Sequence, residues 1–182
     1  ALIFGLGAAA VLVLLLDQVD QSLKDPAIVQ SSLNLPLLGA IPAAPTGEVI
    51  EDLKDKKSAI YEAYLATRTN LTFLTDHGAP KSLMLTSTQP SEGKSSTSIA
   101  LAKGFLEAGK RVLLIDADMR NPSLNRYLSL KSEFGLSNYL SGEDKLDEMI
   151  IHAPELGFDI LSAGPVPPNA ADLLSNDRLS QL

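Results

Sequence analysis

The feature that most constrains the fold is the stretch from Leu83 to Thr97, LMLTSTQPSEGKSST, which ends in Gly93, Lys94 and Ser95. In a phosphate-binding loop, backbone N–H groups at a helix N-terminus hold phosphate oxygens, a lysine adds positive charge, and the following hydroxyl binds Mg²⁺. The usual pattern, G-x-x-x-x-G-K-[ST], has its first glycine where this chain has Thr88. The surrounding residues predict a strand before the loop and a helix after it, which is the context that phosphate binding requires. We therefore predict a variant phosphate-binding loop formed by Gln89, Pro90, Ser91, Glu92, Gly93, Lys94, Ser95 and Ser96.

A second feature follows about 20 residues later, a spacing that suits one β-α-β unit. The segment VLLIDADMR is a continuous apolar run that predicts a strand buried on both faces, and it ends in Asp116 and Asp118. In an open parallel sheet, ligands bind at the carboxyl ends of the strands. A strand beside the loop would bring both carboxylates close to Mg²⁺ and the terminal phosphate. The alternative is a pair of aspartates that only cap a turn, and we favour the metal site.

Strands and helices alternate along the rest of the chain, which predicts an α/β fold with a parallel, P-loop NTPase-like sheet and flanking helices. We expect an amphipathic helix over 58–75, with Ser58 as its N-cap, a strand over 82–86 and a helix over 93–108 that Gly109 ends. Further strands are expected over 111–118 and 158–164. Short helices are expected over 123–127, 136–140 and 145–150, and a last helix over 170–182.

The first 16 residues, ALIFGLGAAAVLVLLL, carry no charge. We interpret them as the C-terminal part of a transmembrane helix, and a buried core helix is the alternative. Residues 17–57 then form a juxtamembrane connector and linker, and residues 58–182 a P-loop domain. The net charge of −7, from 15 basic and 22 acidic residues, argues against nucleic-acid binding.

The two motifs together, TSTQPSEGKSS and LLIDADMR, resemble the Walker A and Walker A′ motifs of the bacterial tyrosine kinases, which are P-loop autokinases that partner capsule and exopolysaccharide export. Loops of that family commonly lack the first Walker glycine and read x-P-G-E-G-K-S, so Ser91 stands in place of a glycine. If the backbone there has a positive φ, Ser91 is strained. The segment SLNLPLLGAIP is similar to the juxtamembrane segment of the family, and ILSAGPVPPNAADLLSNDRL to the region after its third strand.

The resemblance implies a protein-tyrosine kinase that uses ATP and Mg²⁺. Lys94 and Ser95 would hold phosphate and metal, and Asp116 would activate the tyrosine hydroxyl or position Mg²⁺. Asp118 would support the metal through water, and Arg120 would position the loop or the phosphates.

The resemblance also implies partners and a location. The helix EAYLATRTNLTFL is similar to an E-x-x-R-x-x-R helix of ring assembly, with Glu62 and Arg68 matching and Leu65 in place of the first arginine. The partners implied are further copies of the chain, the polysaccharide polymerase and export machinery, a cognate tyrosine phosphatase and the membrane. Residues after about 17 would face the cytoplasm of a bacterium, below its inner (cell) membrane.

Kinases of this kind also have a Walker B strand, D-x-P-P, and a tyrosine-rich tail, both of which we expect after residue 182. We therefore expect the chain to be a fragment that is inactive by itself. Two functional alternatives stay open: a co-polymerase whose nucleotide site only regulates assembly, and a ParA/MinD-type ATPase, whose signature lysine would fall at Gln89. A chance G-K-S in a generic α/β domain would not explain Asp116 and Asp118.

Overall fold

The computed structural model describes residues 5, 7, 11–12, 26–45 and 48–182. They belong to two compact units, divided after Ala40. The predicted membrane segment over 1–16 and the first part of the predicted connector, residues 17–25, lie almost entirely outside the described residues. Within the described parts, no helix is both long enough and apolar enough to span a bilayer.

In the first unit, the described helix is α2 (Ala27–Leu33), which begins after Pro26. It ends at Asn34, whose φ of 52° is left-handed and whose N–H donates to the Gln30 carbonyl. Asparagine is among the few residues that adopt this conformation at low cost, so it ends the helix here.

The sheet of the second unit has three strands in the order β1-β3-β2. They are β1 (Leu113–Ile115), β2 (Ile150–Ala153) and β3 (Phe158–Leu161). β1 and β3 are parallel, with Leu114 opposite Ile160, whereas β2 and β3 are antiparallel, with Ile151 opposite Ile160. The sheet is therefore mixed, and the expectation of a parallel sheet was wrong for β2. Only four residues connect β2 to β3, and so short a connection can join only antiparallel strands.

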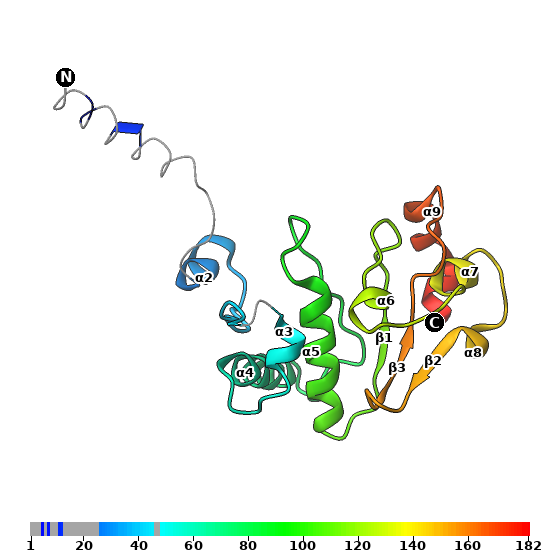
Figure 1. Ribbon diagram of the computed structural model, residues 1–182, viewed down its shortest axis with the longest axis horizontal. Coiled ribbons are helices and arrows are strands. Elements are labelled where there is room, and N and C mark those ends of the chain that lie inside the picture. The colour runs from blue at the N-terminus through cyan, green and yellow to red at the C-terminus, as the bar shows by residue number, and fades with distance from the viewer. Residues whose placement is uncertain (1–4, 6, 8–10, 13–25, 46–47) are drawn as a thin grey trace. The chain divides into compact units, whose positions relative to one another are not determined.

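The helices arrange the second unit in layers (Figure 1). α5 (Lys94–Glu107) lies between the sheet and the pair α3 (Val49–Asp52) and α4 (Ala59–Phe73). One core is formed by Ile99 and Ala102 of α5 with Leu114, Phe158 and Ile160 of the strands. α5 thus has its C-terminal part fixed on the sheet, while its N-terminus carries the glycine-lysine-serine sequence.

A second core lies at the other side of the sheet. It includes Met119, Leu136, Leu140 and Leu161, all at most 2% exposed. The helices around it are α7 (Leu136–Leu140) and α9 (Ala170–Leu174). α6 (Leu124–Tyr127) and α8 (Leu146–Met149) complete the short helices that the sequence predicts, and the expected helix over 170–182 is broken into α9 and the 3₁₀ helix η1 (Asp177–Gln181).

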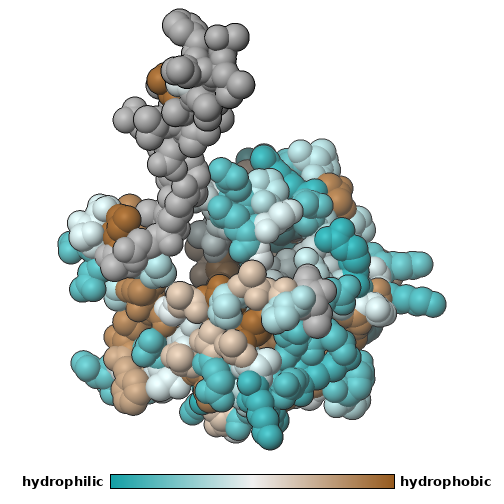
Figure 2. Space-filling model, turned by 60° about the vertical axis from the view of Figure 1, so that its left-hand side comes forward, coloured by the Kyte–Doolittle hydropathy of each residue, from teal (hydrophilic) through white to brown (hydrophobic). Residues whose placement is uncertain are grey.

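The segment before the loop differs from expectation. Residues 82–86 join no strand ladder in the described part of the chain, and Leu83 and Met84 are 44% and 87% exposed. Leu113 of β1 is also 38% exposed, so the prediction that this strand is buried on both faces was wrong. A strand is buried on both faces only where other helices or strands pack against each face. The apolar run in the sequence does not show whether such elements are present. Figure 2 shows hydrophobic as well as hydrophilic side chains on the face that it draws.

Candidate phosphate-binding site

The loop enters α5 through Gly93. Its φ of 87° lies in the left-handed region, and α5 begins at the next residue, Lys94. The Gly93 carbonyl accepts from the Thr97 N–H at 2.9 Å and so starts the helical hydrogen-bond series. The N–H groups of the first turn of this 14-residue helix therefore point out of its N-terminus, as anion binding requires.

Glu92 closes the loop on itself. Its carboxylate accepts hydrogen bonds from the backbone N–H groups of Thr88 and Gln89, at 2.9 and 3.1 Å, and from the Thr88 hydroxyl. The bond from the Gln89 N–H is the main cause that lowers the pKa of Glu92, with the Thr88 hydroxyl next. We refer to these contacts as the Glu92 staple. The side chain therefore shapes the loop from within, a role that the loop pattern does not reveal.

Two loop residues, Pro90 and Ser91, lie between the residues that the Glu92 staple joins. Ser91 has a φ of 66°. The backbone does require a positive φ where the related family has glycine, and the expected strain at Ser91 is therefore present. Pro90 precedes it in the turn, and both residues are exposed.

Lys94 is the first residue of α5, and its side chain extends toward the end of β1. Its Nζ donates to the Ser87 hydroxyl at 3.0 Å and lies 3.9 Å from Asp118 Oδ2. The Lys94 and Asp118 side chains are 32% and 41% exposed, so solvent reaches both. The structure thus brings together the cation of the first motif and one carboxylate of the second.

Asp116 has different surroundings. It is buried, at 7% exposed, and its backbone N–H donates to the Leu161 carbonyl, which continues the pairing of β1 with β3. Its Oδ2 accepts from the N–H groups of Ser123 and Leu124, both at 3.0 Å, and its Oδ1 accepts from that of Asp118 at 3.2 Å. Asp118 Oδ1 in turn accepts from the Asn121 N–H at 3.1 Å. Both aspartates therefore hold the turn over 116–124, which is the alternative that the sequence left open.

A residue that the sequence analysis did not single out, Ser123, joins the two motifs. Its hydroxyl is hydrogen-bonded to the Ser95 hydroxyl of the loop, while its N–H is held by Asp116. The available signal was the turn sequence N-P-S directly after the second motif, which predicts a turn but no contact with the loop.

The remaining predicted residues lie at or near the loop in other roles. The Ser96 hydroxyl donates to the Gly93 carbonyl at 3.0 Å, and the Gln89 carbonyl accepts from the Ser87 hydroxyl at 2.8 Å. Arg120 is exposed and has no hydrogen bond or ion pair with any residue that the structure describes. The structure therefore does not bring Arg120 into the cluster formed by Lys94, Ser95, Asp116 and Asp118.

The oxygen atoms of this cluster suit a hard cation. Mg²⁺ prefers oxygen ligands, and beside a nucleotide it usually takes one or two protein ligands, with water and phosphate completing its shell. The Ser95 hydroxyl and the partly exposed Asp118 carboxylate are donors of that kind. No three His, Cys, Asp or Glu side chains of the described residues form a metal-binding group.

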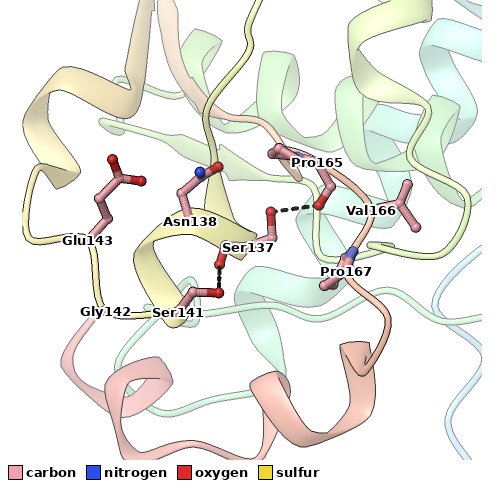
Figure 3. A pocket seen from close by; sticks show the side chains of 8 residues that line it. All are labelled: Ser137, Asn138, Ser141, Gly142, Glu143, Pro165, Val166 and Pro167. Carbon is pink, nitrogen blue, oxygen red and sulfur yellow. Dashed lines mark hydrogen bonds between the residues drawn. The ribbon is translucent and has the colours of Figure 1, made fainter.

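A cavity of about 400 Å³ lies elsewhere, after the carboxyl end of β3 (Figure 3). Ser137 donates to the Pro165 carbonyl at 2.8 Å, and this bond joins α7 to the segment over 165–167. None of the residues predicted to bind phosphate or metal lines this cavity. Its lining is Ser137, Asn138, Ser141, Gly142, Glu143, Pro165, Val166 and Pro167.

The helix expected to assemble rings, α4, is bound to α5. Arg68 donates from Nη1 to the Gly104 carbonyl at 2.9 Å, and the Tyr64 hydroxyl is 3.0 Å from the Thr97 hydroxyl. Glu62 is exposed. Of the two matching motif residues, Arg68 therefore makes an intramolecular contact, whereas Glu62 faces solvent.

The chain is similar in sequence and in structure to known proteins. A family model described as the CobQ/CobB/MinD/ParA nucleotide binding domain matches residues 83–162. The chain is 38% identical over 130 residues to the tyrosine-protein kinase YwqD of Bacillus subtilis, covering 71% of this chain and 55% of that protein. It is 40% identical over 121 residues to the tyrosine-protein kinase etk of Escherichia coli K12, covering 66% of this chain and 17% of that protein. The chain thus spans about half of the first relative and about a sixth of the second.

Solved structures of other proteins also resemble this chain. The BceF tyrosine kinase domain is 32% identical, with a TM-score of 0.75, over 88% of this chain and 70% of that one. This chain belongs to the bacterial tyrosine kinase family. The kinase domain of E. coli ETK, at 29% identity and a TM-score of 0.76, has the same P-loop NTPase-like α/β fold. The match to the nucleotide-binding domain model, over residues 83–162, contains both motifs.

Proposed function

We propose that the chain is part of an ATP-dependent protein-tyrosine autokinase that regulates exopolysaccharide or capsule polymerisation and export. The observation that carries this proposal is the meeting of the two motifs: Lys94 Nζ lies 3.9 Å from Asp118 Oδ2, and Ser95 is joined to Asp116 through Ser123. Phosphoryl transfer needs mainly positioning and charge neutralisation, which such a cluster can supply. A relative in Klebsiella pneumoniae is named a putative tyrosine-protein kinase in cps region, and its name supports the polysaccharide context.

Each residue has a role in this proposal. Lys94 and the N–H groups at the start of α5 bind the β- and γ-phosphates, and Ser95 and Asp118 are the oxygen ligands of Mg²⁺. When bound, Mg²⁺ neutralises charge that develops on the phosphates. Asp116 holds the turn that carries Ser123 and Asp118. Its Oδ1 accepts one hydrogen bond and has a second lone pair, with which it would activate a tyrosine hydroxyl. Arg120, exposed at the same turn but outside the cluster, would position the loop or the phosphates when nucleotide is bound.

Beyond the loop and its neighbouring turn, we propose a membrane-bound setting and partners for the protein. Residues 1–16 would be the end of a transmembrane helix, residues 17–57 a connector, and residues 58–182 the first part of a kinase domain in the bacterial cytoplasm below the cell membrane. The partners would be further copies in a ring through the helix with Glu62 and Arg68, the polymerase and export machinery, and a cognate tyrosine phosphatase.

The test uses the full-length protein that contains this chain, incubated in membranes with Mg²⁺ and labelled ATP and probed for phosphotyrosine. We expect label on the protein itself, lost in Lys94→Met and reduced at least a hundredfold in Asp118→Asn. Lys110→Met, distant in sequence and exposed after α5, is the matched control and should keep the label. Bound nucleotide without phosphotyrosine would contradict the kinase and favour the regulatory co-polymerase, for which the strain at Ser91 is the supporting observation.

A further inference from the structure

The proposed function gives Ser123 no role of its own at the metal, although its hydroxyl is hydrogen-bonded to that of Ser95. Ser95 is in the first turn of α5, and Ser123 directly precedes α6, so 28 residues separate the two hydroxyls. The structure leaves open which hydroxyl is the donor. A hydroxyl that binds a cation does so through an oxygen lone pair, which leaves its proton free to be donated. The direction of the Ser95 lone pairs therefore depends on which acceptor the Ser95 O–H donates to.

Ser123 is held firmly enough to be that acceptor. Its N–H donates to Asp116 Oδ2 at 3.0 Å, as does the N–H of Leu124, and Asp116 is only 7% exposed. The turn is fixed a second time where the Asn121 N–H donates to Asp118 Oδ1. The Ser123 hydroxyl therefore sits on a backbone that two carboxylates hold in place.

We propose that Ser123 is a positioning residue for Mg²⁺: its hydroxyl oxygen accepts a hydrogen bond from the Ser95 hydroxyl and so directs a Ser95 lone pair to the metal. Asp116 then acts on the metal indirectly, through the backbone of Ser123. Partners that orient a metal ligand in this way typically change metal affinity 10–100-fold when they are removed. The inference rests on the proposed function, because it requires a Mg²⁺-nucleotide at the loop.

The test measures the affinity of the chain for a fluorescent ATP analogue, in EDTA and across a Mg²⁺ titration. Ser123→Ala removes the hydroxyl but keeps the N–H that Asp116 holds. We expect unchanged affinity in EDTA and a roughly tenfold higher Mg²⁺ concentration at the midpoint. Ser123→Thr, which restores a hydroxyl, should return to the wild-type midpoint. Ser98→Ala is the matched control, because its hydroxyl donates to the Lys94 carbonyl within α5 and should not affect the midpoint.

Four results would overturn the inference. An unchanged midpoint in Ser123→Ala would show that the hydroxyl does nothing for the metal, and a lower midpoint would show that it competes with the metal for Ser95. An equal loss of affinity in EDTA and in Mg²⁺ would indicate a merely structural role. A wild-type chain that binds no nucleotide in either buffer would contradict the proposed function itself, and the inference with it.

Discussion

At the scale of single residues, Ser91 most clearly connects sequence and conformation. Its φ of 66° places a side chain in a region that costs non-glycine residues about 1–2 kcal/mol. We expect Ser91→Gly to raise the free energy of unfolding by up to about 1 kcal/mol, since glycine relieves the strain but adds freedom to the unfolded chain. Nucleotide affinity should rise as well, because the loop is then held in its bound form at lower cost.

Denaturant unfolding measures the first effect, and Ser91→Ala is its control, since alanine keeps the Cβ and with it the strain. If Ser91→Gly and Ser91→Ala unfold at the same denaturant concentration, the strain has no energetic consequence.

The Glu92 staple gives a prediction for pH. The pKa of Glu92 is lowered in the folded protein from its ordinary value of 4.5, mainly by the N–H of Gln89. Its stabilising effect is therefore complete above pH 4.5 and is lost as the pH falls through the lower, folded pKa. NMR titration of the Thr88 and Gln89 amides should show a midpoint below 4.5 that is absent in Glu92→Gln. A midpoint at or above 4.5 would mean that the staple does not hold the carboxylate.

The sequence revealed part of this site and not the rest. The pattern around Gly93, Lys94 and Ser95 identifies the loop because the chemistry of phosphate binding fixes residue types at fixed spacing. The glycine missing at position 91 also predicted the unusual backbone. Ser123 and the Glu92 staple could not be predicted, because hydrogen bonds across 28 residues or within a tight loop follow from three-dimensional turn geometry.

At the scale of elements, α4 and α5 form the pair that supports the loop. The Tyr64 hydroxyl, on a side chain only 5% exposed, reaches Thr97 in the first turn of α5. We expect Tyr64→Phe to lower the free energy of unfolding by about 1 kcal/mol, the usual net value of such a hydrogen bond. Tyr61→Phe is a matched control on the same helix, since its hydroxyl bonds Glu107 in an exposed pair and should cost less. Equal melting temperatures for the two variants would contradict a supporting role for Tyr64.

The helices were predicted more reliably than the strands. Ser58 does cap α4, accepting from the Tyr61 N–H at 3.1 Å, and Gly109, with φ of 77°, follows the end of α5. Caps and helical periodicity are local signals, so the sequence contains them. The antiparallel strand β2 was missed because Lys145 to Ala153 changes from helix to strand without a break, and pairing with β3 decides where it changes.

At the scale of the whole domain, two chain segments cross beside the second core without space between them. A Cβ on Gly135 would lie 2.1 Å from the Ser162 carbonyl oxygen, and the neighbouring Leu136 N–H donates to that same oxygen. We expect Gly135→Ala to lower the free energy of unfolding by about 3 kcal/mol, because backbone rather than a flexible side chain must move. Gly142→Ala, with nothing within 4 Å of its Cβ but a φ of 111°, should cost about 1 kcal/mol. Chemical denaturation would contradict this account if Gly142→Ala proved the more damaging.

The central claim is that the loop over 88–96 and the turn over 116–124 form one nucleotide site. The most direct test is the amide NMR spectrum of the ¹⁵N-labelled chain during titration with Mg²⁺ and a non-hydrolysable ATP analogue. We expect amide signals of both segments to shift together, with a single saturating concentration, and we expect Lys94→Met to abolish the shifts. Shifts confined to residues 137–143 and 165–167 would place the ligand in the cavity of Figure 3 and would contradict the account.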